Sequence, residues 1–256
     1  MTEPPESKSD FIQQFESRKR DHIELSLDAS TQATGLSGLD CVRLEHSPLP
    51  EIDWGEVSIE QEVFGRKLPT PLLVSSMTAG HVGAVDLNCR LAKACEKRGW
   101  LMGVGSQRRE LTDPQIALEW RALRDQAPKV KLLGNLGLTQ VIETPVSQIQ
   151  SLVDGLQATA MIIHTNPLQE ALQKEGTPQF RGGLTALQRV CKGLNVPVVL
   201  KEVGCGFGRQ SLRMLKDVGL GAVDVSGLGG THWGRVEGGR NTESSLLRNA
   251  AQSFAN

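Results

Sequence analysis

The chain has 256 residues, of which 28 are basic and 29 acidic, so its formal net charge is −1; 39% of the residues are hydrophobic and 22% are charged. This composition is typical of a soluble globular protein with enough chain for one large core, and the balanced charge argues against nucleic-acid partners. No apolar run approaches the roughly 20 residues that cross a bilayer, and the polar first residues lack the apolar core of a secretory signal. We therefore expect a cytoplasmic protein with no membrane partner.

The five cysteines are odd in number and are never spaced as C-x-x-C. This pattern argues against a disulfide framework and against a structural zinc site.

Residues 1–67 are predicted to form an N-terminal extension. Its polar start is followed by a helical pattern from about Asp10 to Leu27, which carries the motif "RKRDH". Residues 28–67 contain glycine and proline breaks and short strand-like pieces such as "VSIEQEVFG", which predict an irregular segment.

Residues 68–256 show a repeating rhythm of apolar strand-like runs and helical patterns. Helical patterns such as "AVDLNCRLAKACEKRGW" and "QSLRMLKDVGL" lie between the runs, and this alternation predicts parallel βα units. Six runs are visible, beginning near Pro71, Leu101, Lys131, Ala160, Pro197 and Gly221.

We predict a (β/α)8 TIM-type barrel rather than a doubly wound sheet, because polar residues follow nearly every strand and a doubly wound sheet gathers them at one switch point. A complete barrel takes about 250 residues, and this region has room for about six βα units. The closing segment, "TESSLLRNAAQSFAN", has the pattern of an amphipathic helix. We expect the chain to end about two βα units before a complete barrel.

The strand ends carry residues suited to ligand binding. Lys201 is the only cation at the end of an otherwise apolar strand, where it can face a negative centre. Any single Ser or Thr at such a position is more often a helix cap, so the coincidence of six strand ends carries the prediction of a site. The donors and acceptors at these ends are Ser76, Thr78, Ser106, Asn135, Ser226 and Thr231.

Seven motifs, in chain order, resemble those of type 2 isopentenyl-diphosphate isomerase: "RKRDH", "MTAG", "GSQR", "NLG", "HTNPLQE", "KEVG" and "GGTHW". The resemblance implies a flavin-dependent (β/α)8 barrel that uses FMN, Mg²⁺ and a reductant such as NADPH. Its reaction would interconvert isopentenyl and dimethylallyl diphosphate in isoprenoid biosynthesis, in a homo-oligomer of four or eight subunits. Two departures from the family pattern are Ala79, where a second glycine is usual, and His232, where a small polar residue is commoner.

The resemblance also implies roles for individual residues. Substrate binding falls to Arg18, Lys19, His22, Ser106, Gln107, Arg108, Asn166 and Gln169. FMN binding falls to Ser76, Met77, Thr78, Ser106, Asn135, Lys201, Ser226 and Thr231. Glu170 is implied as the Mg²⁺ ligand, and Gln169 and His164 as catalytic residues.

The chemistry of these residue types agrees with a diphosphate substrate, which favours arginine forks, lysine charges and a hard cation. An amide is a poor base, so Gln169 is as readily a positioning group as a proton-transfer group. Two alternatives stay open at this point. Lys201 at an apolar strand end also suits a Schiff-base aldolase, and an incomplete barrel could be inactive.

Overall fold

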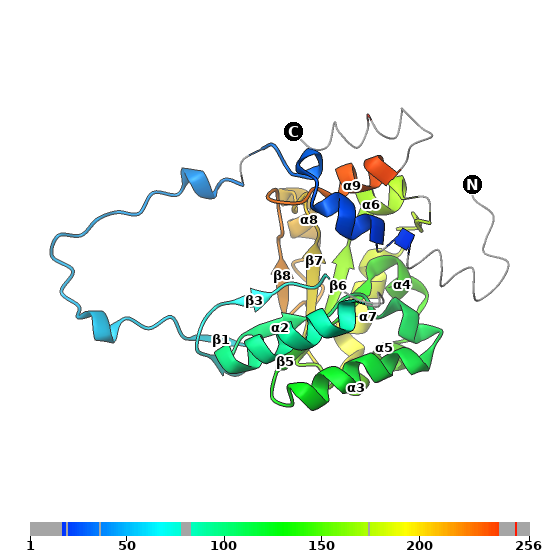
Figure 1. Cartoon of the computed structure of the whole chain (residues 1–256), viewed down its shortest axis with the longest axis horizontal. Coiled ribbons are helices and arrows are strands. Elements are labelled where there is room, and N and C mark those ends of the chain that lie inside the picture. Colours follow the sequence, from blue (N-terminus) through cyan, green and yellow to red (C-terminus); the bar gives the residue numbers. More distant parts are fainter. Residues whose placement is uncertain are drawn as a thin grey trace.

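The computed structural model describes residues 17, 18, 20–35, 37–77, 83–173, 175–240 and 249. Six parallel strands pair in chain order, β3-β4-β5-β6-β7-β8, and the sheet curls into a half-barrel (Figure 1). All six predicted strands are therefore confirmed. Their bounds are β3 Leu73–Val74, β4 Leu101–Gly103, β5 Lys131–Gly137, β6 Ala160–Thr165, β7 Val198–Glu202 and β8 Ala222–Asp224. Among the described residues, β3 and β8 each pair on one side only.

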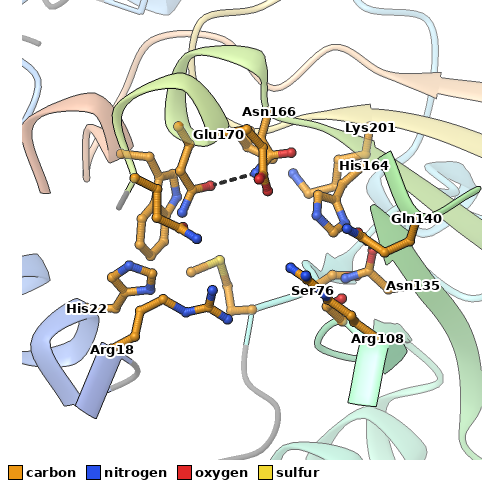
Figure 2. A pocket seen from close by; sticks show the side chains of 16 residues that line it. Arg18, His22, Ser76, Arg108, Asn135, Gln140, His164, Asn166, Glu170 and Lys201 are labelled. Carbon is orange, nitrogen blue, oxygen red and sulfur yellow. Dashed lines mark hydrogen bonds between the residues drawn. The ribbon is translucent and has the colours of Figure 1, made fainter. Parts of the chain in front are cut away.

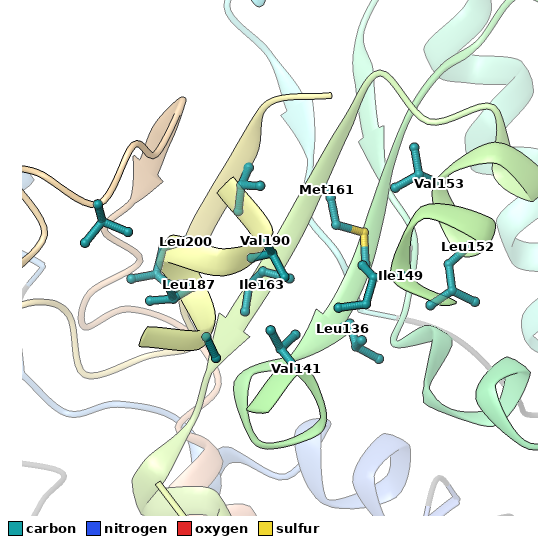
Figure 3. Close-up of a cluster of buried hydrophobic side chains, with 13 residues drawn as sticks. Leu136, Val141, Ile149, Leu152, Val153, Met161, Ile163, Leu187, Val190 and Leu200 are labelled. Carbon is teal, nitrogen blue, oxygen red and sulfur yellow. The ribbon is translucent and has the colours of Figure 1, made fainter. Parts of the chain in front are cut away.

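The central strands are buried on both faces, which explains why their sequences are continuously apolar. On β6, Met161 and Ile163 belong to a core between the sheet and its helices, shown in Figure 3. Ala160 and Ile162 belong to a second core on the opposite, concave face. Because successive side chains of a strand point to opposite faces, one apolar run supplies both cores.

The helices cover the convex face of the sheet, following the strands in turn (Figure 1). In α2, Cys89, Ala92 and Cys95 recur at helical spacing and are buried, and Gly99 ends the helix in the left-handed conformation with φ 70°. The helix predicted there is confirmed, whereas "QSLRMLKDVGL" forms only the short α8. The bounds are α2 Ala84–Arg98, α3 Ala117–Gln126, α4 Leu138–Glu143, α5 Val146–Leu156, α6 Pro167–Leu172, α7 Gly183–Gly193, α8 Arg209–Met214 and α9 Trp233–Arg240, with 3-10 turns at η1 Ala29–Thr31, η2 Leu39–Cys41, η3 Trp54–Glu56, η4 Gln107–Leu111 and η5 Pro114–Ile116.

A small hairpin, β1 (Gln61–Val63) and β2 (Arg66–Leu68), precedes the sheet. Phe64 at its turn has φ 53° and packs against the concave-face core, which includes Leu133 and Val199. The hairpin therefore supplies one apolar side chain to the inside of the half-barrel. In contrast, the preceding residues 37–60 extend away from the sheet and helices, and Leu44 and Trp54 are almost fully exposed (Figure 1).

The N-terminal helical residues 17–26, Lys19 excepted, lie beside α9 and α6 (Figure 1). Gln32 forms an isolated bridge with Thr231, and the His232 N–H donates to the Thr31 carbonyl at 2.9 Å. Residues 31 and 32 of the extension are thus attached to the segment that follows the last described strand. Residues 10–16 of the predicted first helix and almost all of the predicted closing helix lie outside the described residues. In the described part of the chain, no helix is long and apolar enough to cross a membrane.

Candidate active site

A pocket of about 140 Å³ opens at the carboxyl ends of the parallel strands. In Figure 2, Arg18, His22, Ser76 and Arg108 lie across the pocket from Asn166, Glu170 and Lys201. Parallel strands present their carboxyl ends at one mouth, so segments far apart in sequence meet here. The lining comprises Arg18, His22, Ser76, Met77, Ser106, Arg108, Asn135, Gln140, His164, Asn166, Gln169, Glu170, Gln173, Lys201, Val203 and Trp233.

The segment after β6 supplies one wall of the pocket. Asn166 precedes Pro167, the first residue of α6, and its Nδ2 donates to Gln169 Oε1 at 3.0 Å and to Glu170 Oε1 at 3.1 Å. The Thr177 N–H donates to Glu170 Oε2 at 2.7 Å. The buried Glu170 carboxylate is therefore held by two protein donors at the edge of the pocket.

Arg18 and Arg108 bring positive charge to the pocket from two distant parts of the chain. Burial lowers the pKa of Arg18, and the attraction of Glu175 acts in the opposite direction. When the Gln173 amide is oriented to satisfy its neighbours, its oxygen accepts from Arg18 Nη1 at 2.9 Å and its nitrogen donates to Glu237 Oε1 at 3.2 Å. Gln173 thus links a cation of the pocket to a buried carboxylate.

Glu237 on α9 is that carboxylate, and it is not among the predicted site residues. Its Oε1 lies 2.7 Å from His22 Nε2 and accepts from Gln169 Nε2 at 3.1 Å, while its Oε2 accepts from Arg240 Nη1 at 2.8 Å. Burial raises the pKa of Glu237, but its contacts with His22 and Arg240 outweigh burial and hold the pKa below its usual value. The helical spacing of Trp233, Glu237 and Arg240 directly after a strand-end motif is the sequence signal that could have found it.

Lys201 on β7 lies in one cross-strand row with His164 on β6 and Asp224 on β8. Its Nζ donates to the Glu202 carbonyl at 2.9 Å and lies 3.7 Å from Asp224 Oδ2. The Glu202 side chain turns back to accept the N–H groups of Gly204, Cys205 and Gly206 at 2.6–2.7 Å. These three hydrogen bonds fix the turn after β7, which lies next to Lys201 in the chain.

Ser76, after β3, has a buried hydroxyl that finds no hydrogen-bond partner among the described residues. It lines the pocket, and Gly103 lies so close that a Cβ there would contact Ser76 Oγ. A buried hydroxyl without a partner is costly, so a polar ligand group in the pocket is its natural complement.

Most of the predicted site residues line this one pocket, although several do not. Gln107 is buried behind the lining, and its Oε1 accepts the Asn135 N–H at 3.1 Å. Ser226 and Thr231 lie outside the lining, with the Ser226 N–H donating to Asp224 Oδ1 at 3.0 Å. Lys19 and Thr78 lie outside the described residues. The predicted residues in the lining are Arg18, His22, Ser76, Met77, Ser106, Arg108, Asn135, His164, Asn166, Gln169, Glu170 and Lys201.

Comparison with known proteins identifies the family. An isopentenyl-diphosphate delta-isomerase of Legionella pneumophila (strain Lens) is 51% identical over 243 residues, which cover 95% of this chain and 71% of the relative. The chain belongs to the isopentenyl-diphosphate delta-isomerase family. The isomerase of Bdellovibrio bacteriovorus is 50% identical over 95% of this chain and 71% of its own length, and that of Archaeoglobus fulgidus is 42% identical over 86% and 64%.

Membership in this isomerase family confirms the resemblance drawn from the strand-end motifs. No family model matches the chain. Among solved structures, the monotopic membrane protein (S)-mandelate dehydrogenase superposes with a TM-score of 0.50 at 14% identity, covering 83% of this chain and 70% of that one. This likeness concerns the fold alone and agrees with the predicted TIM-type barrel.

Proposed function

We propose that this isomerase-family chain interconverts isopentenyl and dimethylallyl diphosphate, using FMN, Mg²⁺ and a reductant such as NADPH. The observation that carries the proposal is the meeting of Arg18 with the "HTNPLQE" segment across one pocket. More than a hundred residues separate them in the sequence, yet both line the same cavity (Figure 2). Cations, a carboxylate and amides are the groups that a metal-bound diphosphate requires.

Arg18 and Arg108 are the groups proposed to bind the diphosphate. Both line the pocket, and a guanidinium offers forked donors that match phosphate oxygens. Glu170 is proposed as the Mg²⁺ ligand, because its buried carboxylate is already oriented by Asn166 and Thr177. The described residues contain no cluster of three or more metal-ligating side chains, so the remaining ligands would be phosphate oxygens and water.

The pocket also has features that suit FMN. Ser76 offers a buried hydroxyl without a partner, and Asn135 and Lys201 lie in the same lining. When bound, reduced FMN would supply the acid–base chemistry that an allylic proton shift requires. Lys201 would place positive charge beside it, and Ser226 and Thr231 remain proposed for parts of the cofactor beyond this pocket.

Gln169 is proposed to position the substrate rather than transfer the proton. Its amide oxygen accepts from Asn166, and its nitrogen donates to Glu237. With both ends of the amide held, the group is fixed at the pocket edge, and an amide is a weak base. His164, a titratable group in the same lining, is proposed as a catalytic residue beside it.

The proposal is tested by purifying the 256-residue chain and measuring FMN binding and isomerase activity separately. We expect saturable quenching of flavin fluorescence, and turnover that requires Mg²⁺ and a reductant. Flavin binding without turnover would contradict the isomerase activity, whereas absence of flavin binding by a folded chain would contradict the cofactor. The proposed homo-oligomer of four or eight subunits is tested by light scattering on the same sample.

Lys201 provides the control for the aldolase alternative. A Schiff-base enzyme needs a neutral amine, whereas the Lys201 ammonium lies 3.7 Å from the Asp224 carboxylate. We therefore expect no covalent adduct when the chain is treated with borohydride and carbonyl substrates. Trapping of Lys201 by mass spectrometry would favour the aldolase.

A further inference from the structure

A continuous set of hydrogen bonds links the buried region behind the pocket to His164. Asn135 on β5 is at its centre: its Nδ2 donates to the Val104 carbonyl at 3.1 Å, and its backbone N–H donates to Gln107 Oε1 at 3.1 Å. Its Oδ1 lies 2.9 Å from His164 Nδ1. Three of the four polar groups of Asn135 therefore have assigned partners, two in the stretch that follows β4 and one on β6.

The direction of these hydrogen bonds follows from the groups at their ends. A backbone carbonyl can only accept, so the Asn135 NH₂ must face Val104 and its oxygen must face His164. An amide oxygen also only accepts, so His164 Nδ1 must carry a hydrogen. Because a neutral imidazole has one N–H, Nε2 is then the nitrogen with the lone pair.

Gln107 holds this arrangement from behind. It is 1% exposed, and its Oε1 is used by the Asn135 N–H. Its Nε2 donates to the Leu152 carbonyl at 3.4 Å. The nitrogen of Gln107 faces an acceptor and its oxygen faces a donor, so a flipped amide would lose both bonds.

We propose that Asn135 and Gln107 are positioning residues that hold neutral His164 in the tautomer protonated at Nδ1. In this form Nε2 accepts a hydrogen bond from an N–H or O–H group. It can donate to a phosphate oxygen only after taking up a proton. Gln107, which was predicted to bind substrate, thus acts through Asn135 and His164. This inference concerns the chain's own residues and stands independently of the proposed function.

The first test is the tautomer itself, read from long-range ¹H–¹⁵N NMR spectra of the ¹⁵N-labelled full chain without ligand. The chain has five histidines, and the variant His164→Gln identifies the signals of His164 by their loss. The spectra are recorded at a pH where the ring is neutral. We expect Nδ1 to show the ¹⁵N chemical shift of a protonated ring nitrogen, and Nε2 that of an unprotonated one. The opposite assignment overturns the proposal.

Variants then test which residues set the tautomer. Asn135→Ala removes the acceptor, so the ratio of the Nδ1–H to the Nε2–H form should fall about tenfold, the factor expected for one lost hydrogen bond. Gln107→Ala should shift the ratio in the same direction by less. Asn195→Ala, which removes an exposed amide bonded to Gln150, is the control and should leave the ratio unchanged.

An unchanged ratio in both Asn135→Ala and Gln107→Ala contradicts the positioning role. If Asn135→Ala does not fold, the wild-type tautomer and Gln107→Ala still decide the matter. Isomerase activity enters neither measurement, so failure of the proposed function would be recognised separately, in the activity assay.

Discussion

At the scale of single residues, Glu237 carries a negative charge into a place where its side chain is 1% exposed. It is stable there because His22, Gln169 and Arg240 all contact its two oxygens. Removing one partner from a buried charge network leaves the other charges uncompensated. The resulting loss of stability is usually larger than the net stabilisation that the intact network provides. Gln169, which lines the pocket, therefore depends on a residue that is not itself in the pocket lining.

Replacing Glu237 with Gln should lower the free energy of unfolding by about 3 kcal/mol at neutral pH, because Arg240 and His22 lose their charged partner. Urea denaturation measures this change. Exposed Glu143→Gln at the end of α4 is the control and should change stability little.

The same variant carries a pH dependence with a defined sign. The contacts with His22 and Arg240 hold the pKa of Glu237 below its ordinary value of 4.5 in the folded chain. Because the pKa of this carboxyl is lower in the folded than in the unfolded chain, its ionised form stabilises the fold above pH 4.5. This stabilisation is lost as the pH falls through the pKa of the folded chain. The difference in stability between wild type and Glu237→Gln should therefore shrink below pH 4.5; a difference that stays constant into acid would contradict the assignment.

Glu170→Gln tests the proposed metal ligand. The substitution keeps the side-chain shape but removes the charge that binds a hard cation. We expect turnover to fall at least about tenfold and the Mg²⁺ concentration for half-maximal activity to rise, in kinetic assays of the purified variant. Flavin affinity should be unchanged, and a parallel loss of flavin would instead indicate a general disruption of the pocket.

At the scale of elements, two glycines in neighbouring helices differ in what surrounds them. Gly155 in α5 is exposed, and a Cβ there meets nothing within 4 Å. A Cβ on Gly193, the last residue of α7, would lie 2.7 Å from Val146 Cγ1 at the start of α5. Helix propensity alone therefore sets the effect of a side chain at Gly155, whereas at Gly193 there is no space for a side chain beside Val146.

Gly155→Ala should raise the free energy of unfolding by about 0.5–1 kcal/mol, because alanine loses less conformational entropy in a helix. Gly193→Ala is the matched comparison and should lower it by about 1–3 kcal/mol through overpacking against Val146. Thermal denaturation of the two variants beside wild type measures both. Equal effects would mean that helix propensity alone decides, and that the contact is relieved at no cost.

At the scale of the whole molecule, the extension is attached to α9 by charged groups. Arg240 contacts Asp21 at 3.2 Å, Glu175 at 3.0 Å and Glu237 at 2.8 Å. Arg235 adds a bond from its Nη1 to the Gln32 carbonyl at 2.6 Å. These contacts place Arg18 and His22 in the pocket, so the completeness of the site depends on the attachment.

Arg240→Ala should loosen Arg18 and residues 20–26 from α9 and make the "RKR" run more accessible to trypsin. We expect cleavage there to become about tenfold faster, because the fraction of chain with this segment detached rises. Mass spectrometry of timed digests measures the rate, and Arg213→Ala, an exposed change on α8, is the control. Equal rates in both variants would show that the apolar contacts of the segment suffice.

The sequence by itself determined the six parallel strands, most of the pocket lining and the family. Strands buried on both faces need continuous apolar runs, and residues that follow parallel strands meet at one mouth of the barrel. The strands and the pocket-lining residues can therefore both be predicted from the sequence. The "HTNPLQE" segment could be assigned to the site for this reason, and His164, Asn166, Gln169 and Glu170 all line the pocket.

Only the tertiary structure decided how those residues are supported. Glu237 meets His22 across 215 positions, and Gln107 meets Asn135 across 28. A hydrogen bond between such distant residues leaves no periodicity in either segment, so neither Glu237 nor the bond between Gln107 and Asn135 was predicted. Which side chains reach the pocket, and which hold them in place from behind, depends on packing in three dimensions.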